Sequence, residues 1–357
     1  MACQLKLLLL VSITISWLAK FLVHAQSQVP CVFFMGDSLL DNGNNNDLPT
    51  SAKANYPPYG IDFPDGPTDR FSNGQNMADV MAKFLGFDIS PPPFATARGD
   101  ILKGINYASG GAGIRDESGQ QPGEAISLNR QLLNHQTTVS RFASVLGNKE
   151  AADDYLGKCI YIVGMGNNDY LNNYLMTQNY PTSRIYNPDQ FADVLIQQYS
   201  QQLTRLYGLG ARKIAIFGLS LLGCIPAEIA TFGTNGPPCV DFINDYVQLF
   251  NNRLKPLVDD LNKHLKDAKF IYINVTGIQS GGIPAESGFT VTNSPCCVVG
   301  TGKVLCQQNQ VPCRNRSAYV FWDAVHPTEI VNILTVSRAY TAFIPSDAYP
   351  YDIRTEY

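Results

Sequence analysis

A serine near one end of the chain and an aspartate–histidine pair near the other have the residue types and spacing for acyl transfer. Ser38 follows the apolar run Cys31–Gly36, and Asp323 precedes His326 by three positions. Within a turn, this spacing lets the carboxylate reach Nδ1 of the imidazole. A serine hydroxyl is a weak nucleophile until an imidazole takes its proton and a carboxylate orients that imidazole. These residues therefore predict a hydrolytic triad, if folding brings the two ends of the chain together.

Few histidines compete with His326 for the role of base. The chain has four histidines, and His24 falls in the N-terminal segment 1–25, which has the features of a leader. His264 is expected on a solvated helix face, and His135 on a helix as a surface or packing residue. The alternative interpretation of Asp323 and His326 is an ordinary capping pair at the start of a helix.

Ser38 and Ser220 each stand two positions after an apolar run, and neither belongs to the Gly-x-Ser-x-Gly elbow of α/β-hydrolases. Ser38 is favoured over Ser220 because Asp37 and the polar run 41–46 indicate a shaped polar rim around it. The structural alternative for Ser38 is a helix N-cap after a strand. Ser220 remains the main competing candidate.

Acyl transfer also needs hydrogen-bond donors for the developing oxyanion. Glycine-rich 109–113 could present a backbone N–H, because glycine tolerates unusual dihedral angles. The stretch 166–169 could present a side-chain amide. Each alone could be a plain turn, but both follow predicted strands and would share a rim with Ser38.

Residues 1–25 have the features of a cleaved signal peptide. Lys6 precedes the uncharged run 7–19, and small residues stand three positions and one position before a cleavage after Ala25. The alternative is a signal anchor, but Lys20 interrupts the run below the roughly 18 residues that span a bilayer. We expect residues 26–357 to form a single exported domain.

The cysteines and sequons fit export. Nine cysteines become eight once Cys3 leaves with the leader, and an even number in an exported chain indicates disulfides, whose connectivity the sequence leaves open. Zinc is the alternative for the late cluster, which lacks a paired Cys-x-x-Cys. Asn274 and Asn315 begin glycosylation sequons.

The charge balance argues against nucleic acid as a partner. After loss of Lys6 and Lys20, the chain keeps 24 basic and 30 acidic residues, a formal charge of −6. An acidic chain without a basic run is a poor ligand for nucleic acid or for an anionic membrane surface. No later segment is apolar and long enough to cross a bilayer.

Alternating strands and helices must position these groups. The apolar runs predict five buried strands, Cys31–Gly36, Gly104–Ala108, Lys158–Gly164, Lys213–Gly218 and Phe270–Val275. Helical spacing predicts helices over Asn76–Leu85, Ser127–Leu146, Pro188–Leu206, Asp241–Leu265 and Glu329–Phe343. This alternation favours an α/β class fold, a doubly wound three-layer α/β/α sandwich. Long loops at 41–74 and 109–124 follow the first two strands, where open α/β sheets place their sites.

Four ordered blocks carry a resemblance to a known family. They are Phe34–Asn45, Gly104–Gly113, Gly164–Tyr170 and Phe321–Glu329. With these blocks, the chain closely resembles the plant GDSL-type esterase/lipases of the SGNH hydrolase superfamily. The resemblance implies a flavodoxin-like, mainly parallel five-stranded sheet (the SGNH hydrolase fold), secretion, and no metal or other cofactor.

The resemblance also implies roles for individual residues. Ser38 would be the nucleophile, His326 the general base and then acid, and Asp323 the residue that orients it. The oxyanion hole would comprise the Ser38 N–H, the Gly111 N–H and the Asn168 side-chain amide. Two departures from the family pattern lie outside this set: Asp69 stands where a glycine is usual, and 218–224 lacks a customary proline.

The first functional hypothesis is therefore a secreted esterase or lipase that hydrolyses acyl esters, small or polymer-borne, through an acyl-enzyme. An acyltransferase using the same acyl-enzyme is the first alternative, and a wall-associated binding protein without turnover is the second. Acyl-chain length and natural substrate stay open. Tyr56, Tyr59 and Phe63 could line an acyl groove or merely pack a surface loop.

Overall fold

A five-stranded sheet lies at the centre of the molecule in the order β1-β2-β3-β4-β7. The computed structural model describes residues 27–99, 101–234, 236–280 and 288–356. The predicted signal peptide and Cys3 lie outside the described residues. The strands span Val32–Gly36, Ile160–Gly164, Lys213–Phe217, Lys269–Ile273 and Ala348–Tyr349. The first four strands are parallel and only β7 is antiparallel, so the fold is a mainly parallel α/β fold as predicted.

The strands are apolar throughout because both faces of the sheet are covered. In β1, Phe33 and Met35 point into one core cluster, while Val32 and Phe34 point into the other. Side chains alternate between the faces of a strand, so a strand buried on both sides needs apolar residues at every position. The other parallel strands divide between the clusters in the same way.

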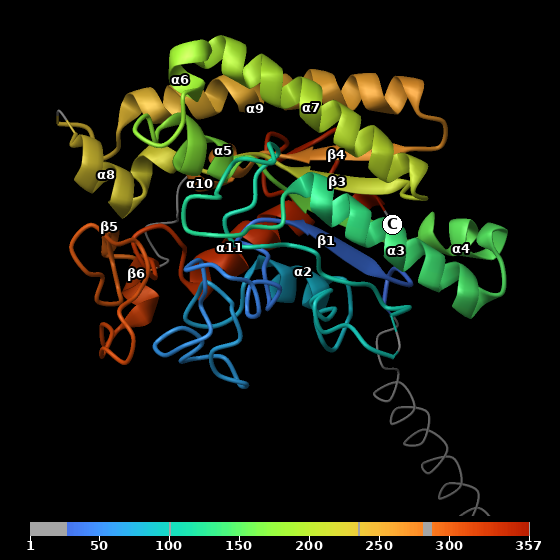
Figure 1. Cartoon of the computed structure of the whole chain (residues 1–357), viewed down its shortest axis with the longest axis horizontal. Helices are drawn as coiled ribbons and strands as arrows, with labels where there is room; N and C mark the ends of the chain where they lie inside the picture. The colour runs from blue at the N-terminus through green and yellow to red at the C-terminus, as the bar shows by residue number, and fades with distance from the viewer. Residues whose placement is uncertain (1–26, 100, 235, 281–287, 357) are drawn as a thin grey trace, which may run out of the picture.

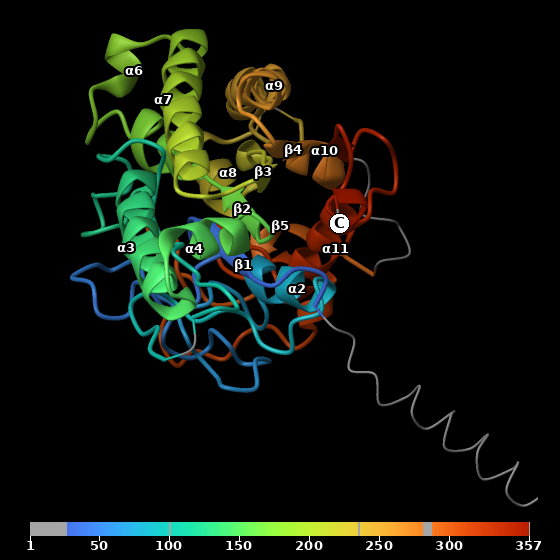
Figure 2. The same ribbon diagram turned by 90° about the vertical axis from the view of Figure 1, so that its right-hand side faces the viewer.

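Helices form an outer layer on each face, as Figures 1 and 2 show. One layer contains α3 (Leu128–Leu146), α4 (Lys149–Leu156), α7 (Pro188–Gly208) and α9 (Asp241–His264). The other contains α2 (Met77–Phe84), α10 (Val275–Ser280) and α11 (Glu329–Tyr340). Local sequence sets several helix starts: Asn76 and Asn187 form capping boxes at α2 and α7, and Ser127 caps α3.

The prediction of a regular strand over Gly104–Ala108 is wrong in detail. The segment runs parallel to β1 and shares backbone hydrogen bonds with it, but it forms only isolated bridges, from Asn106 to Phe34 and to Pro93. Gly104 has a φ of +115°, which turns the backbone out of strand geometry at the start of the segment. With this segment beside β1, the spatial order is that of a flavodoxin-like sheet.

Smaller elements surround the carboxyl ends of the strands. These are α5 (Asn167–Asp169), a π-helix (Tyr170–Tyr174), α6 (Thr182–Ile185), α8 (Pro226–Phe232), the pair β5 (Val291–Pro295) and β6 (Tyr319–Phe321), and two 3-10 turns (Leu222–Cys224 and Arg316–Ala318). A third 3-10 turn, Arg354–Glu356, follows the antiparallel β7. The sequence patterns did not predict them, because all are short and take their stability from tertiary contacts.

The eight cysteines of the described chain form disulfides, as predicted. The pairs are Cys31–Cys159, Cys224–Cys239, Cys296–Cys313 and Cys297–Cys306. The first joins the starts of β1 and β2, and the last two tie the segment before β6. In the described ranges, no helix is both long and apolar enough to cross a membrane.

Candidate active site

β1 ends at Gly36, where two backbones pass too closely for a side chain. A Cβ at Gly36 would lie 2.7 Å from the Gly164 carbonyl oxygen at the end of β2. Gln131 on α3 fixes the same residue, because its Oε1 accepts the Gly36 N–H at 2.9 Å and its Nε2 donates to the Gly36 carbonyl at 2.8 Å. The strand therefore ends at a defined point, two positions before Ser38.

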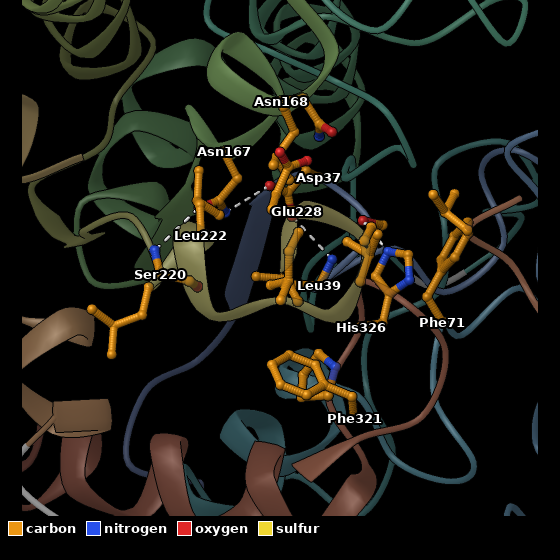
Figure 3. A pocket seen from close by; sticks show the side chains of 18 of the residues that line it. Asp37, Leu39, Phe71, Asn167, Asn168, Ser220, Leu222, Glu228, Phe321 and His326 are labelled. Atoms are coloured by element: carbon orange, nitrogen blue, oxygen red, sulfur yellow. Dashed lines mark hydrogen bonds between the residues drawn. The ribbon is translucent and has the colours of Figure 1, made fainter. Parts of the chain in front are cut away.

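The chain turns at Asp37 and carries Ser38 to the carboxyl edge of the sheet. The Asp37 side chain accepts the Leu39 N–H at 3.0 Å and the Asn167 amide at 3.0 Å. Burial raises the pKa of Asp37, although these hydrogen bonds oppose the shift. Asn167 in turn accepts the Ser220 N–H at 3.2 Å, and Figure 3 shows these contacts. The turns after β1, β2 and β3 are thus connected.

Ser38, His326 and Asp323 form a continuous hydrogen-bonded chain. Nε2 of His326 lies 2.8 Å from the Ser38 hydroxyl, and Nδ1 lies 2.8 Å and 3.0 Å from the two Asp323 carboxylate oxygens. Asp323 is fully buried, whereas 5% of His326 and 9% of Ser38 stay exposed. The ring of His326 packs against Phe71 at a centroid distance of 4.8 Å (Figure 3). The three residues therefore meet the distance requirement for proton transfer.

The three predicted oxyanion donors line one cavity together with Ser38 and His326. Within the described residues, neither the Ser38 N–H nor the Gly111 N–H donates to a protein acceptor. Gly111 has a φ of +84°, a backbone conformation that favours glycine. The Asn168 amide donates one hydrogen bond to the Ala112 carbonyl at 2.9 Å, and its oxygen accepts from Asn172 at 2.6 Å. One amide hydrogen of Asn168 is left for a ligand.

The polar run 41–46 does not form the predicted rim. Asp41, Asn44 and Asn45 are buried and hold the following loops together. The Asp41 carboxylate accepts the Gly110 N–H at 2.9 Å, and Asn45 donates to the Gly110 carbonyl at 2.9 Å. Buried loops need such partners for their backbone groups. The run therefore fixes the glycine-rich loop next to Gly111.

Asp69, where the family pattern has glycine, also has a structural role. Its φ is +71°, so the position favours glycine on backbone grounds. The buried carboxylate accepts the Ala54 N–H at 2.6 Å, and burial raises the pKa of Asp69 to about 6. Neighbouring Arg70 pairs with Asp79 on α2 at 2.6 Å. This departure affects the loop, not the triad.

A cavity of about 1510 Å³ extends from Ser38 and His326. Its walls are largely aliphatic and aromatic, and include Leu39, Leu171, Leu175, Leu221, Leu222, Ile225, Phe321 and Val325. Tyr56 lines the cavity, whereas Tyr59 is buried behind Asp323 and Phe63 packs on the Arg70 guanidinium at 4.2 Å. Of the three aromatic residues considered from the sequence, one contributes to the cavity wall.

One acidic residue of this wall has an unusual environment. Glu228 on α8 projects into the cavity region shown in Figure 3, and its Oε2 is buried without a hydrogen-bond partner in the described protein. Burial raises the pKa of Glu228 to about 7. Near neutral pH, this carboxyl group can therefore change charge inside an apolar cavity.

The other sequence candidates lie apart from the triad. His135 is buried among aromatic rings, and His264 is exposed on α9, with its Nδ1 3.0 Å from the Asp260 carboxylate. Ser220 lines the cavity, but in the described structure its hydroxyl makes no hydrogen bond to a histidine. Sequence reasoning missed Asn167, although it stands beside Asn168, and Gln131, which carried no signal.

An α/β sheet with a linked serine, histidine and aspartate at its carboxyl edge has the form of a hydrolytic enzyme. Residues 32–337 match the GDSL-like lipase/acylhydrolase family model. The chain belongs to this family, and it is a carboxylic ester hydrolase with acyl esters as substrates.

Similar proteins cover nearly the whole chain. Two GDSL esterase/lipases of Arabidopsis thaliana are 53% and 48% identical to it, over 92% and 98% of this chain and 92% and 96% of their own. Among solved structures, the lipase Lip_vut3 from a goat rumen metagenome aligns with a TM-score of 0.37 and 10% identity over 86% of this chain and 94% of its own. A likeness this weak decides nothing about fold or function.

Proposed function

We propose that the protein cleaves carboxylic esters by attack of the Ser38 hydroxyl, with His326 as general base and acid and Asp323 as the residue that orients it. One observation carries the proposal: the hydrogen-bonded chain from the Ser38 hydroxyl to the Asp323 carboxylate, with both links at 2.8 Å. Ser38 and His326, at one end of this hydrogen-bonded series, line a cavity large enough for an ester with a long acyl group.

The first half-reaction forms an acyl-enzyme. Nε2 of His326 takes the proton of Ser38 as Oγ attacks the ester carbonyl, and Asp323 stabilises the resulting imidazolium through Nδ1. The tetrahedral intermediate then collapses, its C–O bond to the alcohol breaks, and the imidazolium protonates the departing alcohol oxygen. Water repeats the sequence on the acyl-enzyme, releases the carboxylic acid and restores Ser38.

The charge that develops on the carbonyl oxygen needs donors that are already in place. The Ser38 and Gly111 N–H groups and one amide hydrogen of Asn168, which have no acceptor among the described residues, support this role. Asn168 cannot rotate freely, because Ala112 and Asn172 bind both ends of its amide. Such preorganisation lets the donors stabilise the intermediate without reorganising during the reaction.

The apolar wall favours esters with an apolar acyl group over small charged esters. Burial of a methylene group contributes about 0.8 kcal/mol, so each carbon that enters the cavity adds to binding. A chain-length series from acetyl to palmitoyl p-nitrophenyl esters should show kcat/KM rising over the first several carbons. A preference for acetyl esters over all longer ones would contradict this assignment.

Export and glycosylation belong to the same proposal. Four disulfides fit an oxidising compartment. Of the two sequons, Asn315 is exposed, whereas the Asn274 amide donates to the Ser346 carbonyl at 3.0 Å and its oxygen accepts the Gly277 N–H at 3.0 Å. We expect a glycan at Asn315 and none at Asn274, which peptide mass spectrometry before and after glycosidase treatment would test.

The decisive experiment compares Ser38→Ala with the unmodified enzyme. An organophosphonate probe should label the folded enzyme at Ser38, and Ser38→Ala should lose the label together with about 10⁴-fold or more of kcat. Ser220→Ala, the matched control from the same cavity, should still take the label. Full activity in Ser38→Ala, or a label that moves to Ser220, would refute the assignment of the nucleophile.

A further inference from the structure

The Asp323 carboxylate has partners on both of its oxygens. Oδ1 accepts the Val325 and His326 N–H groups at 2.8 Å and 2.7 Å, which fixes the carboxylate within its own turn. Oδ2, the oxygen nearer to Nδ1 of His326, accepts a further hydrogen bond from the Tyr59 hydroxyl at 2.6 Å. Tyr59 lies 264 positions away, in the loop after β1. A remote segment thus reaches the far side of the triad.

The direction of the Tyr59 hydrogen bond is fixed by a second contact. The Cys306 N–H donates to the Tyr59 oxygen at 3.1 Å. A backbone N–H can only donate, and an ionised carboxylate can only accept. The hydroxyl hydrogen therefore points at Asp323, and the same oxygen accepts from Cys306.

Packing holds the Tyr59 ring in this position. The side chain is fully buried, with edge-on contacts to Tyr56 at 5.3 Å and to Phe71 at 6.1 Å between ring centroids. Phe71 also packs on the imidazole of His326. The ring therefore has a rigid setting that does not depend on its hydroxyl.

The partner backbone of Cys306 is held firmly as well. Cys306 is bonded to Cys297, and the Cys297 N–H donates to the Trp322 carbonyl at 2.9 Å. The Ala324 N–H donates to the Val304 carbonyl at 3.0 Å on the other side of the turn. The segment closed by the Cys297–Cys306 disulfide therefore makes backbone hydrogen bonds to the residues on both sides of Asp323.

We propose that Tyr59 is a positioning residue of the triad, which holds Oδ2 of Asp323 in line with Nδ1 of His326 and moderates the charge of that carboxylate. The proposal rests on the triad assignment made above. Burial and the nearby Asp323 charge raise the pKa of Tyr59 well above its ordinary value, so the hydroxyl keeps its proton at all working pH values. The hydrogen bond is accordingly available whenever Asp323 is ionised.

The test is Tyr59→Phe, which removes the hydroxyl and keeps the ring. We expect kcat for a p-nitrophenyl ester to fall about tenfold, the typical effect of losing one charge-assisted hydrogen bond, with KM nearly unchanged. The acid limb of kcat/KM against pH should move to higher pH. Without the donor, the carboxylate is more negative and holds the imidazolium more strongly.

Tyr56→Phe is the matched control. Its hydroxyl comes from the same loop and donates to the Cys306 carbonyl at 3.0 Å, without touching Asp323. Tyr56 also lines the cavity, so the comparison uses only the position of the acid limb, which we expect to match that of the unmodified enzyme. The other charged or titratable groups around the pair, Asp37 and Asp69, are unchanged in both variants, so a displaced limb reports the Tyr59 hydroxyl.

The outcomes separate this inference from the triad assignment. An unmoved limb and an unmoved kcat in Tyr59→Phe, with Ser38→Ala inactive, would overturn the positioning role alone. The same result with an active Ser38→Ala would instead remove the triad. Equal limb displacements in Tyr59→Phe and Tyr56→Phe would also overturn the inference, since they would assign the effect to loop packing. Thermal midpoints of both variants, measured alongside, exclude unfolding as the cause.

Discussion

Two buried histidines, His135 and His326, occupy regions of opposite chemical character. His135 lies in the core on one face of the sheet, with the rings of Phe33, Tyr107 and Tyr161 at 5.0, 5.4 and 5.4 Å. His326 lies at the carboxyl edge, between a carboxylate and a hydroxyl. Both are at least 95% buried, so burial does not distinguish them.

The partners of each ring decide what it can do. Near His135, the Tyr107 hydroxyl lies 3.1 Å from Nδ1, while Nε2 has no hydrogen-bond partner in the described protein. Burial without a counter-charge lowers the pKa of His135 to about 3, so the ring stays neutral at ordinary pH. A general base must accept a proton and keep it briefly. In the proposed mechanism Asp323 gives His326 that ability, whereas no carboxylate faces His135 in the described part of the chain.

The sharpest test of this comparison replaces each histidine by glutamine. His326→Gln should lower kcat by about 10³- to 10⁶-fold, because the proton of Ser38 then has no acceptor. His135→Gln should leave kcat unchanged per folded molecule and should lower the thermal midpoint. The measurement is active-site-titrated turnover of a p-nitrophenyl ester. A large loss of kcat in His135→Gln at full folding would break the comparison.

The same contrast applies to buried asparagines. Asn168→Ala should reduce kcat about 10²- to 10³-fold with little change in KM, the usual effect of removing one oxyanion donor. Asn173 is a buried neighbour whose amide donates to Ser118 and whose oxygen accepts from Thr182. Asn173→Ala should therefore change stability rather than kcat per folded molecule. If Asn168→Ala instead raised KM and left kcat unchanged, the role of Asn168 would be substrate binding.

Much of the fold could be predicted because long elements have repeating patterns. The spacing of apolar residues in α3, α7 and α9 placed each helix within two residues of its observed ends. Short elements such as α8 and β5 carry too few residues for a period to emerge. The segment 104–108 shows the limit, because its residues resemble a strand, whereas Gly104 has a φ of +115° and no regular strand forms.

The sequence could predict the site residues that belong to short local motifs, but not those that act through long-range contacts. The four motif blocks indicated Ser38, Gly111, Asn168, Asp323 and His326, and all five line or adjoin one cavity. Tyr59 and Gln131 act through contacts across 264 and 95 positions of the chain. No local pattern records such a contact, because any buried tyrosine or glutamine would look the same in sequence.

The low pKa of His135 predicts a pH dependence of stability. The unfolded histidine takes up a proton below about pH 6.5, whereas the native one stays neutral to about pH 3. His135 therefore makes its full contribution to the free energy of unfolding above pH 6.5. This contribution is lost as pH falls toward 3, by up to about 1.4 kcal/mol per pH unit. Urea unfolding of His135→Gln and of the unmodified enzyme should converge on acidification, since the variant lacks this loss. Parallel curves between pH 6.5 and 4 would contradict the assignment.

Glu228 combines features of the two histidine environments. Like His135, it has a buried polar atom without a partner in the described protein, and like His326, it lines the cavity. With a pKa of about 7, its carboxyl is neutral below that pH and charged above it. A charged group disfavours the approach of an apolar chain that would strip its water. For a long-chain ester, KM should therefore rise about two- to fivefold from pH 6 to pH 8.5. Glu228→Gln should keep the low KM throughout, while Glu150→Gln, an exposed change on α4, should follow the unmodified enzyme. A KM that rises equally in Glu228→Gln would assign the change to another group and leave Glu228 without influence on the substrate.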